Sequence, residues 1–378
     1  MIEKKTILHL CEHFGGAEAS LHGVARSFQW WIPLFDETKF RVLLCSRKGV
    51  DKAYREMRAS GLHPLTLGYH KFDFRNLFAL IRLLRREKVD LIHAHGMGAS
   101  MWARLAEFYL KTPVIVHGRC NYGTVPVFQR PVERMLGPRT KYALAVSEST
   151  RQFTIRKRYI PAENVQVLYN GIVLDHIVHL SSGEIAQMRE DEFNVPTDRM
   201  VLGVVGRLES HKGHLDVLQA MRSLKDLPVE LWIIGDGAYA APIEKAIREN
   251  QLTGKVRMLG FRRDIIRCIQ CLDIQIFPSH QEGTPNTLYE AMAVGNPIVA
   301  TTADGQGEIL VDGKTATLYA PGDTEKLGRG IRELVKNPEL RKERGLAARQ
   351  RSLDFDGKKM IRAMEELYDR ILSVKCGT

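Results

Sequence analysis

The chain has 378 residues, of which 44% are hydrophobic, and a formal net charge of +11. This length suits two domains of moderate size better than one, and the apolar content excludes a largely disordered protein. The sequence has no run that approaches the roughly 18 apolar residues of a membrane span, and its first residues lack the features of a signal peptide. We therefore expect a cytoplasmic protein, either free or peripheral on the inner face of the membrane.

The first half of the chain alternates short apolar runs with amphipathic helical stretches, of which residues 74–88 are one. The runs are rich in β-branched residues and do not alternate with polar ones, which is typical of strands covered on both faces. The alternation indicates a parallel sheet built from βαβ units. The predicted strands are 6–10, 41–46, 62–67, 90–95, 113–118, 142–147 and 165–170.

A polar stretch at 181–199 reads as a connection with one short helix, after which the pattern restarts. We expect an α/β protein with two Rossmann-like doubly wound domains, 1–172 and 173–356, facing across a deep cleft. An amphipathic helix within 357–378 should pack back onto the first domain. Ligands of such sheets bind beyond the carboxyl ends of the strands. The predicted strands of the second domain are 200–206, 229–235, 255–260, 274–279, 297–303 and 315–320.

Two cations follow the first strand of the second domain. Gly206 ends that strand, and Arg207 and Lys212 lie in the loop before the helix predicted at 214–224. An arginine fork, a lysine point charge and a helix N-terminus together suit a diphosphate. A solvated loop with two ordinary surface cations is the alternative.

A more specific motif is the sequence PSHQEGTPNTLYEAMAVGNPIVAT at 278–301. A helix is expected to begin near Pro285 and Asn286, since proline favours the first helical position. The backbone from Gly283 through Thr284 to Leu288, including Thr287, should bring amides to an anion. Glu282 in the loop and Glu290 in the helix are carboxylates that can accept hydrogen bonds from sugar hydroxyls.

Glycines and histidines mark the strand ends of the first half. Gly15 and Gly16 follow the first strand, where they allow close approach of a ligand or form a plain tight turn. His93, His95 and His117 lie at strand ends, and His117 is the best candidate for chemistry in the cleft. Of His93 and His95 we expect one to point into the packing.

No metal site is predicted. Asp354 and Asp356 form the one Asp-x-Asp pair, but they precede the last helix and read as turn and cap residues. Cys268 and Cys271 lie three apart on a predicted helix without a second ligand pair, so we interpret them as buried thiols.

The basic excess lies in the first half, where residues 1–172 carry a net charge of +13 and the remainder −2. A domain with this net positive charge should face an anionic partner. The cations of the 74–88 helix, with the aromatic group at 30–35, suit an anionic membrane surface, although the same aromatics could equally be core residues. Nucleic acid as a partner is suggested only by the net positive charge, and the sequence contains no known nucleic-acid recognition module that supports it.

Together these motifs resemble the family 4 retaining glycosyltransferases of the GT-B fold. The resemblance spans nearly the whole chain and includes 15–18, 90–95, 167–177 and 206–213, with the Glu-x7-Glu element at 282–290. It implies that Arg207 and Lys212 hold the donor diphosphate, that Glu290 holds the ribose and that Glu282 lies by the sugar. It also implies that His117 lies near the sugar and Gly16 near the diphosphate, and that Arg262 helps to frame the base.

The expected activity is transfer of a hexose from a UDP- or GDP-sugar to a lipid-linked or saccharide acceptor, with retention and without a metal cofactor. Cell-envelope polysaccharide, lipopolysaccharide or glycolipid assembly is the expected setting. The alternatives are a nucleotide-sugar epimerase of the same fold and a non-catalytic nucleotide-sugar-binding protein. Thr284, Pro285 and Asn286 depart from the commoner loop of the family, which leaves the donor sugar open.

Overall fold

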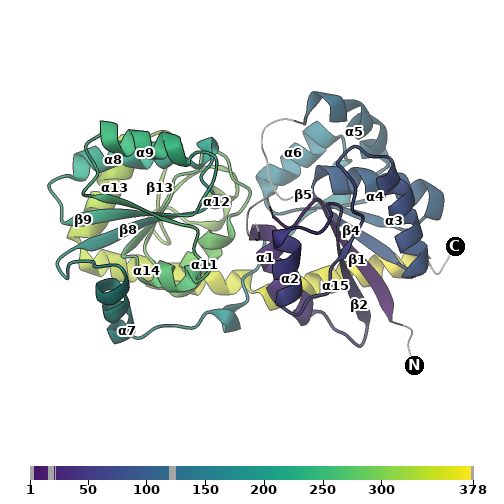
Figure 1. Cartoon of the computed structure of the whole chain (residues 1–378), viewed down its shortest axis with the longest axis horizontal. Coiled ribbons are helices and arrows are strands. Elements are labelled where there is room, and N and C mark those ends of the chain that lie inside the picture. The colour runs from purple at the N-terminus through teal and green to yellow at the C-terminus, as the bar shows by residue number, and fades with distance from the viewer. Residues whose placement is uncertain (1–3, 16–20, 22, 119–124, 376–378) are drawn as a thin grey trace. The chain divides into compact units, whose positions relative to one another are not determined.

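The computed structural model describes residues 4–15, 21, 23–118 and 125–375. The chain divides into two compact units. Unit 1 comprises residues 1–171 together with 357–378, and unit 2 comprises residues 172–356. Within each unit, helices cover both faces of a parallel sheet (Figure 1). Among the described residues, no helix is long and apolar enough to cross a membrane.

Unit 1 holds a seven-stranded sheet in the order β3-β2-β1-β4-β5-β6-β7, with every described pair parallel. The strand order reverses between β1 and β4, which is the topological switch point of a doubly wound sheet. The strands are β1 (Lys5–Cys11), β2 (Phe40–Ser46), β3 (Leu65–Thr66), β4 (Leu91–His95), β5 (Val114–Gly118), β6 (Tyr142–Ala145) and β7 (Val165–Val167).

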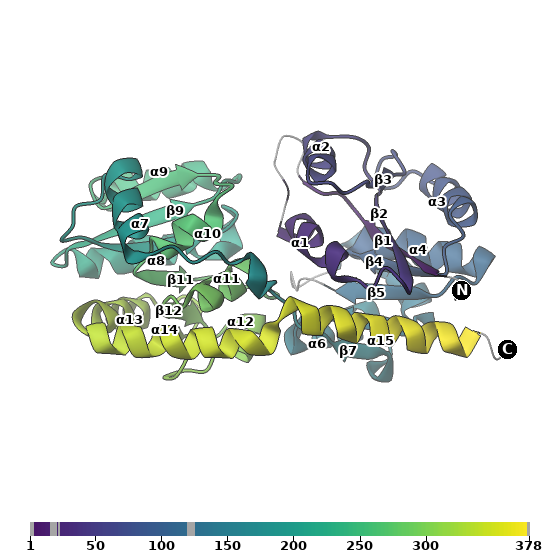
Figure 2. The same ribbon diagram turned by 90° about the horizontal axis from the view of Figure 1, so that it is seen from below.

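The alternation of side chains along β1 divides the core of unit 1 between two faces. Leu8 and Leu10 pack in the cluster that also holds Leu80 and Trp102, on the α3 and α4 side. His9 points the other way, because successive side chains of a strand face opposite sides. There it meets Tyr368 of α15, the helix drawn in yellow along the sheet in Figure 2. The helices are α1 (Gly23–Trp31), α2 (Lys52–Ala59), α3 (Arg75–Arg86), α4 (Met97–Leu110), α5 (Arg130–Leu136), α6 (Glu148–Arg158) and α15 (Gly357–Lys375).

Unit 2 holds a six-stranded sheet in the order β10-β9-β8-β11-β12-β13, again with parallel pairs. Its switch point lies between β8 and β11, the two strands that precede the motifs singled out above. The strands are β8 (Met200–Val205), β9 (Val229–Ile234), β10 (Val256–Gly260), β11 (Ile274–Phe277), β12 (Ile298–Thr301) and β13 (Thr317–Tyr319).

The polar stretch before β8 forms a short helix, as expected. A capping box starts it, in which Ser181 and Glu184 each bond the other's backbone N–H. A π-helical turn at Met188–Glu192 follows. The helices of unit 2 are α7 (Ser182–Gln187), α8 (His214–Met221), α9 (Ala240–Glu249), α10 (Ile265–Gln270), α11 (Asn286–Val294), α12 (Asp304–Ile309), α13 (Thr324–Lys336) and α14 (Pro338–Ser352).

The structure corrects one expectation about unit 1 and decides between the alternatives for two aromatic residues. The strand predicted at 62–67 is reduced to the two residues of β3, which pairs only with β2 at the sheet edge. For the aromatic group at 30–35, surface and core were both open, and two of its rings lie in the core. Trp31 and Phe35 are 2% and 4% exposed, and the indole N–H of Trp31 donates to the carbonyl of Gly171. These rings therefore stabilise the core and are not available to enter a lipid interface.

Candidate functional site

The loop after β8 and the loop after β11 lie next to each other at the switch point of unit 2. Gly213 ends the first loop with a φ of 70°, a conformation that glycine adopts at little cost. A Cβ at this position would lie 1.9 Å from the carbonyl oxygen of Pro278, which begins the second loop. The absence of a side chain at Gly213 thus lets the two loops approach. Gly206, at the end of β8, has open space where its Cβ would be.

Both predicted diphosphate cations contact carboxylates. Lys212 forms an ion pair with Glu282, and Arg207 forms one with Glu209. The side chains of Lys212 and Glu282 are 14% and 13% exposed, whereas that of Arg207 is 54% exposed. The first pair is thus shielded from water and the second largely solvated. Two motifs 70 residues apart in the sequence therefore meet in one site.

The helix start predicted in the second motif is confirmed. Pro285 occupies the N-cap of α11, and the helix begins at Asn286. The hydroxyl of Thr287 donates to the carbonyl of Val205 at 3.4 Å, which ties α11 to the end of β8. The first amides of a helix have no partner within it, so α11 presents the positive end of its dipole beside the cations.

Three predicted residues of this motif are buried. Thr284 is 6% exposed, and Leu288 and Glu290 are each 0% exposed. The amide of Leu288 donates to the carbonyl of Pro285 at 3.0 Å, so the expectation that it is an anion donor is corrected. The first turn of the helix uses this N–H internally.

Asp304 is a residue of the site that the sequence did not reveal. Its carboxylate accepts a hydrogen bond from the backbone N–H of Glu282 at 3.0 Å. Gly305 follows, and a Cβ there would lie 1.9 Å from the carbonyl oxygen of Gly283. The start of α12 therefore packs against the loop that holds Glu282 and bonds its backbone. Its contact with Glu282 follows from the neighbouring positions of β11 and β12 in the sheet.

Histidines surround the Lys212 side of the site. Burial, together with the charge of Lys212, lowers the pKa of His214 to about 4. Burial and Lys212 also lower the pKa of His211. His280, which lies on the second loop, bonds the carboxylate of Asp216 at 2.6 Å. At neutral pH His214 is therefore uncharged, and Lys212 carries the local positive charge.

Arg262 lies beyond the end of β10, two strands from β8. It forms ion pairs with Asp264 and Glu192, and its hydrogen bonds to Asp264 raise its pKa. The neighbouring Phe261 is 45% exposed. Phe261 therefore presents an exposed aromatic ring, whereas the guanidinium of Arg262 is engaged in ion pairs.

His117 belongs to unit 1, where it lies at the end of β5 and is 1% exposed. Its Nδ1 lies 2.9 Å from Nε2 of His93. Both His93 and His95 are buried, so the expectation that only one of them points into the packing is wrong. Residues two apart in a strand share a face, which puts the pair side by side. Gly16, the other candidate of unit 1, lies outside the described residues.

His9, His93 and His95 form the group of unit 1 whose ring nitrogens, all within 4.8 Å of one another, could hold a metal ion. Asp354 and Asp356 do not belong to a comparable group within the described chain. Asp354 instead pairs with Arg351 at 2.8 Å, in the short helical turn before α15. Cys268 and Cys271 are free and buried, as predicted.

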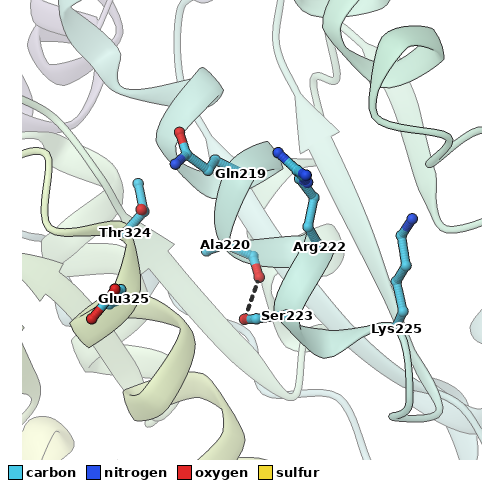
Figure 3. A pocket seen from close by; sticks show the side chains of 7 residues that line it. All are labelled: Gln219, Ala220, Arg222, Ser223, Lys225, Thr324 and Glu325. Carbon is cyan, nitrogen blue, oxygen red and sulfur yellow. Dashed lines mark hydrogen bonds between the residues drawn. The ribbon is translucent and has the colours of Figure 1, made fainter.

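A polar hollow on unit 2 lies away from this site, between the end of α8 and the start of α13 (Figure 3). Gln219, Arg222 and Thr324 are among its lining residues. The hydroxyl of Ser223 donates to the carbonyl of Ala220, and both residues line the hollow. None of the predicted site residues lines it, and it lies on helices and not at the carboxyl ends of strands.

Comparison with known families identifies both halves of the chain. Residues 15–176 match the model described as Glycosyltransferase Family 4, and residues 187–351 match the one described as Glycosyl transferases group 1. The chain belongs to the group 1 glycosyltransferases. Its two doubly wound units are those of the GT-B fold.

Relatives of this glycosyltransferase occur in archaea and in bacteria. An uncharacterized glycosyltransferase of Methanocaldococcus jannaschii is 26% identical over 77% of this chain and 70% of its own length. The UDP-Gal:alpha-D-GlcNAc-diphosphoundecaprenol alpha-1,3-galactosyltransferase of Escherichia coli is 23% identical over 62% of this chain and 63% of its own length. Among solved structures, Anabaena HepE in complex with UDP superposes with a TM-score of 0.83 at 21% identity, over 97% of this chain and all of that one.

Proposed function

We propose that this glycosyltransferase transfers a hexose from a UDP- or GDP-sugar to an acceptor, with retention of anomeric configuration and without a metal ion. The observation that carries the proposal is that the loop with Arg207 and Lys212 is joined to the loop and helix after β11, by the Lys212–Glu282 ion pair and by the hydrogen bond from Thr287 to Val205, at the switch point of unit 2. Cations and helix amides at such a point are suited to a diphosphate. The Anabaena relative, whose structure contains UDP, supports this choice of ligand.

In the proposed reaction the bond between the anomeric carbon and the diphosphate breaks while the bond to the acceptor oxygen forms on the same face of the sugar. The acceptor proton passes to the departing phosphate. Negative charge builds on that phosphate in an oxocarbenium-like transition state. A cation about 4 Å away is worth roughly 4 kcal/mol at an effective dielectric near 20. Arg207 and Lys212 would supply this stabilisation from fixed positions.

Glu282 is proposed to face the transferred sugar and Glu290 the ribose, with Gly206 and the backbone from Gly283 to Asn286 next to the diphosphate. Glu282 forms an ion pair with Lys212, one of the two cations proposed to hold the phosphate. Donor binding would then exchange a carboxylate for a phosphate at Lys212 and release Glu282 toward sugar hydroxyls. Phe261 and Arg262 are proposed to frame the base, since an exposed ring can stack on it.

The acceptor is proposed to be lipid-linked or a saccharide, met at an anionic membrane surface during cell-envelope polysaccharide, lipopolysaccharide or glycolipid assembly. The Escherichia coli relative acts on a diphosphoundecaprenol-linked sugar, which supports the lipid-linked form. In unit 1, Phe74 and Phe78 are 74% and 67% exposed beside the cations of α3. Exposed aromatics next to arginines suit the boundary of an anionic bilayer.

The test begins with a panel of UDP- and GDP-sugars, each measured for its effect on the melting temperature. A donor that binds only the folded protein raises that temperature. The best donor is then incubated with lipid-linked and free saccharide acceptors, and the anomeric configuration of the product is determined by NMR. Transfer with inversion would contradict the stereochemical part of the proposal, and the absence of stabilisation by any nucleotide sugar would contradict the whole.

The same mixtures without an acceptor distinguish the competing functions. An epimerase of this fold would convert the nucleotide sugar by itself, while a glycosyltransferase consumes the donor only slowly by hydrolysis. A non-catalytic binding protein would be stabilised by a donor and release no nucleotide with any acceptor. Nucleotide release that depends on the acceptor is the expected result.

A further inference from the structure

The two loops at the switch point of unit 2 are joined along their backbones. We call residues 206–213 the cation loop and residues 278–285 the donor loop. The carbonyl of Pro278 lies against Gly213, where a Cβ would leave no room for it. Two residues further on, the backbone N–H of His280 donates to the carbonyl of His211 at 2.8 Å. The start of the donor loop therefore runs along the cation loop.

Two ion pairs of side chains add to these backbone contacts. The first is the pair between Lys212 and Glu282. The second joins His280 to Asp216, with Nε2 of the histidine 2.6 Å from Oδ2 of the carboxylate. A carboxylate only accepts hydrogen bonds, so Nε2 of His280 carries the proton in this contact. The donor loop is thus held by its side chains at two alternate positions, 280 and 282.

Asp216 is a well-placed partner for His280. It lies in the first turn of α8, where its backbone N–H donates to the carbonyl of Gly213 at 3.1 Å. A negative side chain is favoured in the first turn by the helix dipole. The side chains of His280 and Asp216 are 44% and 20% exposed. A partly exposed pair stabilises a fold only modestly, so its importance depends on which other contacts hold the same loop.

The other edge of the donor loop is bonded to β12 and α12. The hydroxyl of Thr301, which is fully buried, donates to the carbonyl of Ser279 at 2.7 Å. The carboxylate of Asp304 accepts from the backbone N–H of Glu282 at 3.0 Å. Of the contacts described for this loop, the pair between Lys212 and Glu282 is the one that a donor phosphate would displace.

Under the proposed function, donor binding therefore changes what holds the donor loop. In the free protein both ion pairs hold it, so the loss of one leaves the other in place. Once phosphate has replaced Glu282 at Lys212, the pair between His280 and Asp216 remains, because neither of its groups is exchanged. This pair then contributes more to the stability of the bound state than to that of the free state. Its removal should weaken donor binding more than it weakens the fold.

We propose that His280 and Asp216 are positioning residues of the donor site, which keep the donor loop in place while the donor phosphate occupies Lys212. This inference rests on the proposed function, in which the phosphate takes the place of Glu282. His280 and Asp216 act through the backbone of residues 283–286, which is proposed to lie next to the diphosphate. Amides that are already in place bind an anion without the cost of ordering the loop.

His280→Ala removes the pair and is tested by calorimetric binding of UDP and of GDP. We expect affinity for the nucleotide that binds the unaltered protein to fall about threefold to fivefold, as for the loss of one partly exposed ion pair. The melting temperature without nucleotide should change by less than about 1 °C. His280→Gln, whose amide can donate to Asp216, should recover most of the affinity. Unchanged affinity in His280→Ala would overturn the inference, and so would a glutamine variant as weak as the alanine variant.

Asp216→Ala should weaken nucleotide binding as much as His280→Ala, and the double variant should be no weaker than either. Asp226→Ala is the matched control, because Asp226 forms an ion pair with Arg332 in the same unit, also with 2.6 Å between the charged atoms. Its affinity should change less than about twofold. An equal loss in the control would show that breaking any such pair of unit 2 has this effect, and the assignment to His280 and Asp216 would fail.

A Glu282→Gln background separates this inference from the proposed function. There the ion pair with Lys212 is missing before and after binding, so the pair of His280 with Asp216 matters equally to both states. His280→Ala should then change nucleotide affinity less than about twofold and lower the melting temperature of the free protein by about 2–4 °C. A threefold to fivefold loss of affinity in both backgrounds would refute the inference alone. If Lys212→Ala binds the nucleotide as tightly as the unaltered protein, or neither nucleotide binds at all, the proposed function fails as well.

Discussion

Lys212 and Glu282 form an ion pair that joins the loop after β8 to the loop after β11. Both side chains are largely shielded from water, so the pair is not an ordinary surface salt bridge. Under the proposed mechanism it also places a carboxylate where the donor phosphate would lie. Under that mechanism Lys212 and Glu282 stay paired until the donor phosphate replaces the carboxylate at Lys212.

Arg207→Ala and Lys212→Ala should each lower the rate of transfer at least about tenfold, because each removes a charge-assisted contact to the leaving phosphate. Initial rates with the best donor of the panel measure this. Arg222→Ala is the matched control, since Arg222 lines the polar hollow of Figure 3 and not the predicted site. Near-normal turnover in both variants would remove the leaving-group role.

Glu282→Gln should separate nucleotide binding from transfer. Loss of the carboxylate frees Lys212 for phosphate, so UDP or GDP should bind as tightly as before or a few times more tightly. Transfer should fall about tenfold or more, because a sugar contact weakens. Calorimetry and initial rates give the two quantities. Nucleotide binding that weakens along with the rate would show that the pair supports the site and does not compete with the donor.

Asp304→Ala should lower transfer several-fold, because the backbone N–H of Glu282 loses its acceptor and the loop loses its support. Asp304→Asn keeps a side-chain oxygen in the same place and should recover most of that loss. If the asparagine variant is as impaired as the alanine variant, the charge of Asp304 matters and the positioning explanation fails.

The buried, neutral His214 should make unit 2 less stable in acid. Its pKa is about 4 in the folded protein and near 6.5 when unfolded, so the unfolded chain binds the extra proton between these values. The stabilisation is complete above pH 6.5 and is lost as the pH falls toward 4, by about 3 kcal/mol in total. Urea unfolding midpoints at pH 7 and pH 5 should converge in His214→Gln, whereas the exposed His63 replaced by Gln should keep the wild-type difference.

Phe74→Ser combined with Phe78→Ser should weaken sedimentation with vesicles that contain anionic lipid, at low salt. The substitutions remove two exposed rings beside the arginines of α3 and leave the charge unchanged. Leu346→Ser removes an exposed apolar residue from unit 2 and serves as the control. Wild-type protein that stays in the supernatant under these conditions would end the membrane proposal.

The sequence predicts strand ends well because turn and helix-start residues follow them directly. Gly206, Pro285 and Asn286 lie at the ends of elements where expected. Contacts between distant segments are harder to predict. The approach of Asp304 to Glu282 depends on the neighbouring positions of β11 and β12, and no local pattern encodes it.

The histidines show a different limit. The period of two along β4 implies that His93 and His95 share a face, although each residue taken alone is compatible with a site or a packing role. Their partners come from β1, from β5 and from Tyr368, which is 275 residues away from His93. The environment of such a residue follows from sheet register and from a helix at the other end of the chain, neither of which is visible in a local motif.

Unit 1 is discontinuous in sequence, since its last helix is made only after all of unit 2. During synthesis, β1, β4 and β5 therefore leave the ribosome before Tyr368 has been made. Until then the buried histidines on these strands lack the hydroxyl that bonds His9 and His93 in the folded unit. Unit 2 is continuous and can fold as soon as it emerges. A nascent chain that stops short of α15 would then carry a complete unit 2 and an incomplete histidine core in unit 1.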